Sequence, residues 1–348
     1  MKHWLLFGLL LSLGLTSCHD DADAPTIEPI PGAELPSNFP PAVYGPEQNP
    51  PDRATFELGR SLFYDPQLSR DGKVSCGSCH QQFAAFSQAG HTLSHGVDGR
   101  LGTRNSPALQ NLRWKPSFMW DGGAHHIENQ PIAPLMNPVE MDETMNGVLA
   151  KLNANAGYQK RFAAIYKRSP IDSYQLLRAL AQFTAALTSS NSRYDHYVRH
   201  EAGGTLDAAE LRGLALVQAK CASCHATDLF TDETFRNNGL SSSFPLDSGR
   251  AHITGLPADV GLFKVPSLRN VALTPPYMHD GRFASLAQVL AHYDHGVLAS
   301  PTLDAALRPA GGRLGIALTA LEQQDIIAFL QTLTDQEFIS NKQLAEQP

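Results

Sequence analysis

The chain has 348 residues, of which 18% are charged and 42% are hydrophobic, and its formal net charge is −7 at pH 7. This length and composition suit a folded protein of about two ordinary domains rather than a disordered chain. The negative charge disfavours nucleic acid as a partner, and beyond the N-terminus no segment is apolar and long enough to cross a bilayer.

The N-terminus has the pattern of an export signal. Residues 1–17 hold one lysine and then a long apolar run, which is typical of a secretory signal peptide and too short for a spanning helix. The sequence LTSC at 15–18 resembles a bacterial lipobox, which predicts cleavage before Cys18 and lipidation of its thiol. An ordinary signal peptide with an incidental cysteine is the alternative. We therefore expect a periplasmic lipoprotein, attached to a membrane only through Cys18, with residues 18–50 as a flexible, proline-rich tether.

The other four cysteines form two matching patterns. Each pair is followed directly by histidine, as CGSCH (76–80) and CASCH (221–225). C-x-x-C-H is the attachment signal of c-type haem, in which two thiols form thioether bonds and the imidazole ligates the iron. Zinc or disulfides are the alternatives, but two copies that use every remaining cysteine favour haem. One covalent haem c is thus predicted on each set, namely Cys76, Cys79 and His80, and Cys221, Cys224 and His225.

A longer motif is also repeated. NSPALQNLRWKPSFMWDGG (105–123) aligns to VPSLRNVALTPPYMHDGR (265–282) at a constant offset of 159 residues. The offset pairs Trp120 with His279. Repetition of a haem motif and of the loop after it predicts an internal duplication of a cytochrome c-type domain, as residues 51–200 and 201–348.

Helical patterns surround these motifs. An amphipathic run at 56–63 precedes the first haem motif, and one long helix is expected over 171–197. Asp207 and Glu210 have capping-box spacing at the start of a helix before the second haem motif, and a last helix is expected over 319–333. No run alternates as a strand would, so we expect a mainly α fold.

The second axial position of each iron decides between electron transfer and chemistry. Ser285 begins a predicted helix whose apolar face includes Tyr293, and a tyrosinate can ligate haem iron; a packed core phenol is the alternative. The offset of 159 maps Tyr293 onto Pro134, which has no donor atom for iron. The second haem is therefore expected to be closed and the first to be open or loosely capped.

Two residues are candidates for the open site. His95 lies in a glycine-rich loop (93–102) that would let it act as a movable cap. Glu140 lies near Pro134, and a carboxylate beside an open haem can move a proton from one peroxide oxygen to the other. From spacing alone, both residues could equally lie on the surface.

These motifs resemble those of the bacterial dihaem cytochrome c peroxidase family, including its MauG branch. The resemblance covers roughly residues 51–335 and is carried by LFYDPQLSRDGKVSCGSCH, RNSPAL, FMWDGG, NPVEM and VPSLRNVALTPPYMHDG. It implies that the N-terminal haem binds peroxide in a pocket with Gln130, Pro134 and Glu140, with Glu140 as acid and base. It also implies that Trp120 relays electrons between the haems, and that His95 ligates the N-terminal iron at rest and leaves on activation.

The resemblance further implies a calcium ion between the domains. Asn105 would supply an amide oxygen, and Thr274 and Pro276 backbone carbonyls, and oxygen ligands suit calcium.

The residue type at position 293 bears on the choice between a peroxidase and a MauG-like enzyme. Peroxidases that take electrons from small cytochromes usually have methionine at this position, whereas MauG-type enzymes have tyrosine, and an anionic ligand favours ferric iron. The leading hypothesis is a peroxidase that reduces hydrogen peroxide to water, with electrons from a small cytochrome c or another periplasmic donor passed through the C-terminal haem. The alternative is a MauG-like enzyme that uses peroxide and a high-valent haem to oxidise Trp or Tyr of a partner protein. A non-enzymatic dihaem electron carrier is a third hypothesis. The resemblance leaves open whether the protein is a homodimer.

Overall fold

The fold is mainly helical, as expected. The computed structural model describes Met1 and residues 29–347, so the predicted signal peptide after Met1 and the predicted lipidation site Cys18 lie outside the described residues. A two-stranded antiparallel sheet pairs β1 (Phe235–Arg236) with β2 (Phe263–Lys264). The α-helices are α1 (Arg53–Tyr64), α2 (Cys76–Cys79), α3 (Ile132–Met136), α4 (Met145–Ala154), α5 (Ala156–Tyr166), α6 (Ser173–Ala185), α7 (Arg193–Val198), α8 (Ala208–Lys220), α9 (Ala251–Thr254), α10 (Leu286–Ala291), α11 (Ala320–Gln331) and α12 (Gln336–Ser340).

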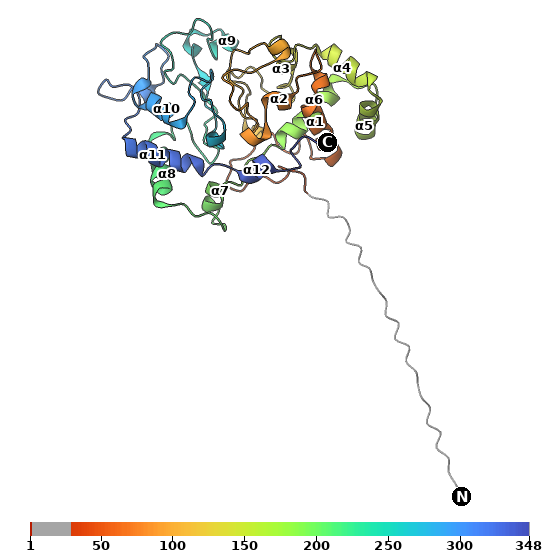
Figure 1. Cartoon of the computed structure of the whole chain (residues 1–348), viewed down its shortest axis with the longest axis horizontal. Coiled ribbons are helices and arrows are strands. Elements are labelled where there is room, and N and C mark those ends of the chain that lie inside the picture. Colours follow the sequence, from red (N-terminus) through yellow and green to blue (C-terminus); the bar gives the residue numbers. More distant parts are fainter. Residues whose placement is uncertain (2–28, 348) are drawn as a thin grey trace.

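The chain forms two lobes that lie side by side (Figure 1). In each lobe the helix before the haem motif crosses the last long helix, α1 on α6 and α8 on α11. A glycine stands at both crossings. A Cβ added to Gly59 would lie 2.0 Å from the carbonyl oxygen of Ala179, and one added to Gly213 would lie 2.0 Å from that of Asp325. The same close crossing is therefore built twice, which supports an internal duplication.

The repeated loops also have matching shapes and contact each other. Each contains an isolated antiparallel bridge, Phe118 with Ala124 and Tyr277 with Phe283. The methionine after the first bridge residue has a positive φ in both copies, 68° and 75°. The amide of Gln110 donates to the carbonyl oxygen of Arg269, which stands at the equivalent position of the other copy (2.6 Å). The two copies of the loop thus contact each other, through equivalent positions, where the lobes adjoin.

Residues 29–50 do not form the flexible tether that their composition predicts. The backbone N–H of Tyr44 donates to the carbonyl oxygen of Arg113 (2.8 Å), and the indole N–H of Trp114 donates to that of Pro40 (2.8 Å). The Tyr44 side chain belongs to the core of the N-terminal lobe. The segment lacks a core of its own, but its backbone groups and apolar side chains find partners on that lobe.

The domain boundaries 51–200 and 201–348 stay a prediction, but the C-terminal end of each of these halves packs on the core of the other. Phe338 of α12 and Leu344 belong to the core of the N-terminal lobe, and the hydroxyl of Tyr64 donates to the carbonyl oxygen of Leu344 (2.9 Å). Conversely, Tyr194 of α7 belongs to the core of the C-terminal lobe. Each half therefore ends on the body of the other.

The long helix expected over 171–197 is interrupted. α6 ends at Ala185 and α7 begins at Arg193, because the polar segment between them makes specific tertiary bonds. Buried Ser189, for example, donates to Asp335 (2.9 Å). The predicted capping box is confirmed, since Asp207 and Glu210 cap α8.

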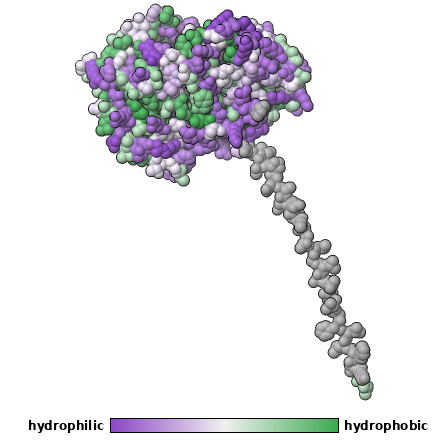
Figure 2. All heavy atoms as spheres, viewed as in Figure 1, coloured by the Kyte–Doolittle hydropathy of each residue, from purple (hydrophilic) through white to green (hydrophobic). Residues whose placement is uncertain are grey.

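Most of the surface in view is hydrophilic, with apolar side chains scattered between polar ones (Figure 2). Such scatter is normal for a folded domain. Among the described residues, no helix combines the length and apolar character needed to span a membrane.

Candidate functional site

The first haem motif presents its three groups on one turn. Cys76 and Cys79 begin and end α2, and the N–H of His80 closes the turn on the carbonyl oxygen of Cys76 (2.9 Å). The Nδ1 atom of His80 lies 2.9 Å from the carbonyl oxygen of Phe86. Because a carbonyl can only accept, Nδ1 carries the proton and Nε2 keeps a free lone pair. Burial lowers the pKa of His80 to about 4, so the imidazole is neutral at pH 7. These are the groups and the protonation state that a covalent haem requires.

The second motif has the same local geometry. The Nδ1 atom of His225 lies 3.1 Å from the carbonyl oxygen of Phe230, and burial lowers the pKa of this imidazole as well. Cys221 and Cys224 are free thiols in the structure. Burial raises the pKa of Cys221 to about 11, with the neighbouring thiol as a smaller cause. Both motifs therefore fit a covalent haem c.

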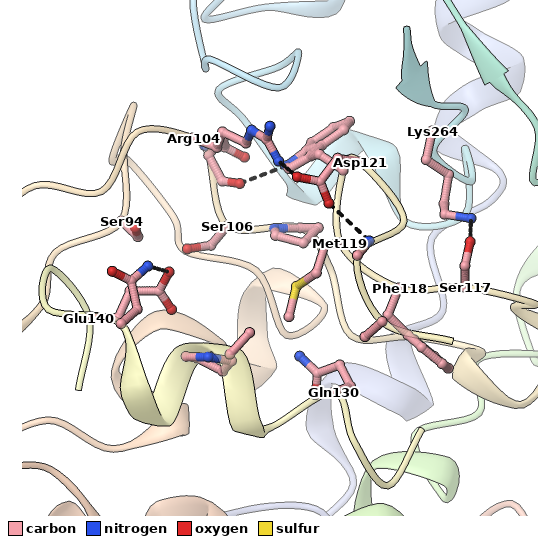
Figure 3. A pocket seen from close by; sticks show the side chains of 18 of the residues that line it. Ser94, Arg104, Ser106, Ser117, Phe118, Met119, Asp121, Gln130, Glu140 and Lys264 are labelled. Carbon is pink, nitrogen blue, oxygen red and sulfur yellow. Dashed lines mark hydrogen bonds and ion pairs between the residues drawn. The ribbon is translucent and has the colours of Figure 1, made fainter. Parts of the chain in front are cut away.

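A cavity of about 1080 Å³ opens beside the first motif. Cofactor and ligand pockets are typically about 300–1,000 Å³, so this one has room for a large planar group and a small oxidant. The residues expected there are brought together, since Gln130, Pro134, Glu140 and Trp120 line the cavity with Cys79 and His80. Figure 3 shows Gln130 and Glu140 on either side of the short helix α3.

Glu140 has the surroundings of a proton-transfer group. One of its carboxylate oxygens, Oε1, accepts a hydrogen bond from the Asn137 amide (2.8 Å), and no donor among the described residues bonds to Oε2. Burial raises the pKa of Glu140, and the bond from Asn137 opposes this rise. The glycine-rich loop holds the backbone of Glu140 in place, because the N–H of Val97 donates to the carbonyl oxygen of Glu140 (2.8 Å).

His95 does not line the cavity in this structure. Its ring is exposed, and its Nε2 lies 3.2 Å from Nδ1 of His91. Only its backbone approaches the haem motif, with the carbonyl oxygen 3.5 Å from the sulfur of Cys79. Its role as a resting ligand stays a prediction.

Tyr293 lies on the side of the second motif. It sits in a π-helical turn after α10 and packs against Val297, Leu303 and Leu307. Burial raises the pKa of Tyr293 to about 12; the Asn238 amide lowers it, and the nearby thiols of Cys224 and Cys221 raise it slightly. The phenol is thus close enough to the thiols of the second haem motif to interact with them electrostatically, whereas Pro134, at the equivalent position, lines the cavity beside the first.

Trp120 and His279, the paired residues of the repeat, contact each other between the lobes. Their ring centroids are 6.4 Å apart, and Phe263 stacks on His279 at 3.6 Å. The indole N–H donates to the carbonyl oxygen of Asn105, and the backbone carbonyl of Trp120 accepts from the N–H of Lys264 (both 2.8 Å). Trp120 is therefore fixed at the wall of the first cavity and against the other lobe.

Comparison with known proteins identifies the family. The family model of di-haem cytochrome c peroxidase matches residues 53–203. The methylamine utilization protein MauG of Methylorubrum extorquens is 36% identical over 297 residues, which cover 84% of this chain and 82% of the relative. This chain belongs to the di-haem cytochrome c peroxidase family.

Relatives with both kinds of name occur in the family. Cytochrome c551 peroxidase of Nitrosomonas europaea is 32% identical over 241 residues, or 67% of this chain and 71% of the relative. The crystal structure of a MauG-like protein associated with microbial copper homeostasis matches with a TM-score of 0.79 and 35% identity, over 90% of this chain and 98% of that one. Membership implies two haem c groups and an oxidoreductase, but does not decide between a peroxidase and a MauG-like enzyme.

The interdomain calcium site that the family resemblance implies stays a prediction. The Asn105 amide nitrogen donates to the carbonyl oxygens of His91 (3.0 Å) and Thr92 (3.2 Å), so its oxygen remains available to a cation. Its backbone N–H donates to the carbonyl oxygen of His279 across the lobes (2.7 Å). These contacts concern Asn105 alone and do not place the Thr274 and Pro276 carbonyl oxygens around a common cation.

Two cationic side chains at the cavity, Lys264 and Arg104, were not predicted from the sequence. Lys264 is buried and donates to the Ser117 hydroxyl (2.6 Å). Arg104 bridges Asp121 of its own lobe (2.6 Å) and Asp247 of the other (2.7 Å), and Figure 3 shows it at the rim of the site. Their only sequence signal is their position: Arg104 directly precedes the first repeated motif, and Lys264 the second.

Proposed function

We propose that this protein reduces hydrogen peroxide to water at the first haem motif, with electrons delivered through the second. One observation carries the proposal: the surroundings of the two haem motifs differ. Glu140, Gln130 and Pro134 line an open cavity beside His80, whereas the phenol of Tyr293 lies near the thiols of the second motif.

The chemistry divides between the cofactor and the chain. A haem held by Cys76, Cys79 and His80 would supply the redox chemistry through which peroxide accepts electrons. Hydrogen peroxide takes up two electrons and two protons and gives two water molecules. Glu140 would accept a proton at Oε2 from one oxygen of the peroxide and return it to the other as the O–O bond breaks. The Asn137 amide keeps the carboxylate oriented while it does so.

Electrons would cross between the lobes at Trp120. Its ring lines the first cavity and lies near His279 of the other lobe, so it links the two haem sites through aromatic contacts. A small cytochrome c or another periplasmic donor would reduce the second site.

A second candidate function is oxidation of a partner protein, and Tyr293 favours it. A phenolate ligand stabilises oxidised iron, which hinders reduction by a donor and suits removal of electrons from a substrate. In that case a Trp or Tyr of the partner would lose the two electrons that peroxide gains.

Two measurements on the purified dihaem protein test and separate these functions. Peroxide consumption with a reduced small cytochrome c as donor supports the peroxidase. Consumption without such a donor, together with a mass increase on a Trp or Tyr of a candidate partner, supports the second function. A protein that consumes no peroxide under either condition would rule out both.

Export and calcium belong to the same proposal. Lipid on Cys18 would place the enzyme at the periplasmic face of a membrane, and mass spectrometry of the mature N-terminus tests this. Calcium at Asn105 would join the lobes, and a chelator should then lower the unfolding temperature. An unmodified N-terminus, or a chelator without effect on unfolding, would contradict the respective part.

A further inference from the structure

The turn after each haem motif ends in a phenylalanine whose backbone carbonyl oxygen accepts a hydrogen bond from the haem-ligating histidine of that motif. Phe86 and Phe230 both have a left-handed backbone, with φ of 59° and 52°. Their carbonyl oxygens lie 2.9 Å from Nδ1 of His80 and 3.1 Å from Nδ1 of His225. Because this bond sets the orientation and the basicity of a ligating imidazole, the position of each phenylalanine matters to the iron.

Each of these phenylalanines packs against an aromatic residue from the opposite half of the chain. Phe338 lies on Phe86, with ring centroids 5.4 Å apart, and it comes from α12 at the end of the C-terminal half. Tyr194 lies on Phe230 at 5.1 Å, and it comes from α7 at the end of the N-terminal half. α7 follows α6 as α12 follows α11, so equivalent elements are exchanged. Figure 1 shows α12, at the very end of the chain, beside the N-terminal lobe.

The exchanged segments are fixed where they cross. The backbone N–H of Tyr194 donates to the carbonyl oxygen of Thr332 (3.2 Å), which joins the two segments directly. Buried Asp335 accepts from the N–H of Phe338 at the start of α12 (3.0 Å) and from the Ser189 hydroxyl (2.9 Å). These bonds hold each exchanged segment in place on the opposite lobe.

A further contact ties α12 to the turn that holds His80. The Gln82 amide, four residues before Phe86, donates to the carbonyl oxygens of Phe338 (3.1 Å) and Asn341 (2.9 Å). Phe86 itself is fully buried. The turn is thus held by the C-terminal segment through both a ring contact and two hydrogen bonds.

We propose that Phe338 and Tyr194 are reciprocal positioning residues, each fixing the proximal histidine of the haem in the opposite half. Neither touches the reacting atoms. Each supports the phenylalanine whose carbonyl holds Nδ1 of the histidine. Loss of the ring would let that phenylalanine move and weaken the hydrogen bond. The imidazole would then donate less charge to the iron, ferric iron would be less stabilised, and the reduction potential would rise. The inference rests on the two haem attachments, not on the peroxide chemistry.

The test is the reduction potential of each haem in the full-length dihaem protein, followed by absorbance and electron paramagnetic resonance. Phe338→Leu is expected to raise the potential of the N-terminal haem alone, by about tenfold in the oxidation equilibrium, or 59 mV for one electron. Tyr194→Leu should raise that of the C-terminal haem alone. Tyr194→Phe keeps the ring and should leave both potentials unchanged, although it removes the bond to Asp228.

A purely structural role predicts a different result. It would lower the unfolding temperature without a crosswise shift, so unchanged potentials in both leucine variants, or equal shifts of both haems in each, would overturn the proposal. If Phe338→Leu does not fold, Gln82→Ala provides a milder test. It removes the bonds to the carbonyl oxygens of Phe338 and Asn341 and should raise the N-terminal potential by a smaller amount; no shift would contradict the inference.

Discussion

Replacement of Glu140 by glutamine tests the proposed proton transfer. The amide keeps an oxygen that can accept from Asn137, whose donor now lies 2.8 Å from Oε1, so the packing should persist. It cannot take up a proton at neutral pH. General acid–base catalysis contributes about 10²–10⁴-fold, so kcat/KM for peroxide should fall by that factor, or about 3–5 kcal/mol of barrier.

The same substitution should not destabilise the protein. Burial raises the pKa of Glu140 in the folded state. The stability that the protonated carboxyl contributes is therefore full below its unfolded pKa and is lost as pH rises through the raised folded pKa. Above the raised folded pKa the buried carboxylate carries a cost that glutamine lacks, so at such pH the unfolding temperature of Glu140→Gln should equal or exceed that of the wild type.

The assay is the rate of peroxide consumption against pH, with thermal unfolding in parallel. The wild-type rate should fall on the acid side as Glu140 becomes protonated, and the variant should lack this limb. Glu143→Gln is a matched control, because Glu143 pairs with Lys151 (2.5 Å) and is absent from the cavity wall. A Glu140→Gln enzyme that keeps wild-type activity, or loses activity only together with its fold, would refute the reasoning.

Three further predictions concern the haem sites and the fold. Tyr293→Met should raise the reduction potential of the C-terminal haem, as measured by redox titration; an unchanged potential would make Tyr293 a core residue only. Trp120→Phe should slow electron transfer between the haems in stopped-flow experiments without loss of haem, whereas an unchanged rate would place the route elsewhere. Gly59→Ala and Gly213→Ala should each lower the free energy of unfolding by about 1–3 kcal/mol in denaturant titrations, because the new methyl group meets backbone at 2.0 Å; wild-type stability would show that the helices can separate freely.

Local signals predicted much of the fold and of the haem sites. The CGSCH and CASCH motifs each form one turn, because two thiols and a histidine within five residues leave little freedom. The capping pair Asp207 and Glu210 marks a helix start through contacts made within four residues. Pro134 lines the first cavity and Tyr293 lies near the second motif, as expected if duplicated loops keep their geometry, and ligation of iron by Tyr293 stays a prediction.

The features that the sequence did not reveal depend on distant contacts. Residues 29–50 have the composition of a tether, but their partners are supplied by Arg113 and Trp114 of the N-terminal lobe. Phe338 carries no signal of its place beside Phe86, more than two hundred residues earlier, because an apolar side chain at helical spacing fits any core. His95 differs again, since its ring is exposed and pairs with His91, a contact that the glycine-rich sequence around it does not indicate.

The central claim is that one haem site is open to an incoming ligand and the other is closed by Tyr293. Cyanide titration of the fully oxidised and the half-reduced protein, followed by electron paramagnetic resonance, tests it most directly. We expect one equivalent of cyanide to bind per chain in at least one of these states, at the N-terminal haem, while the signal of the tyrosinate-ligated haem persists. Binding of two equivalents, or of none in both states, would contradict the claim.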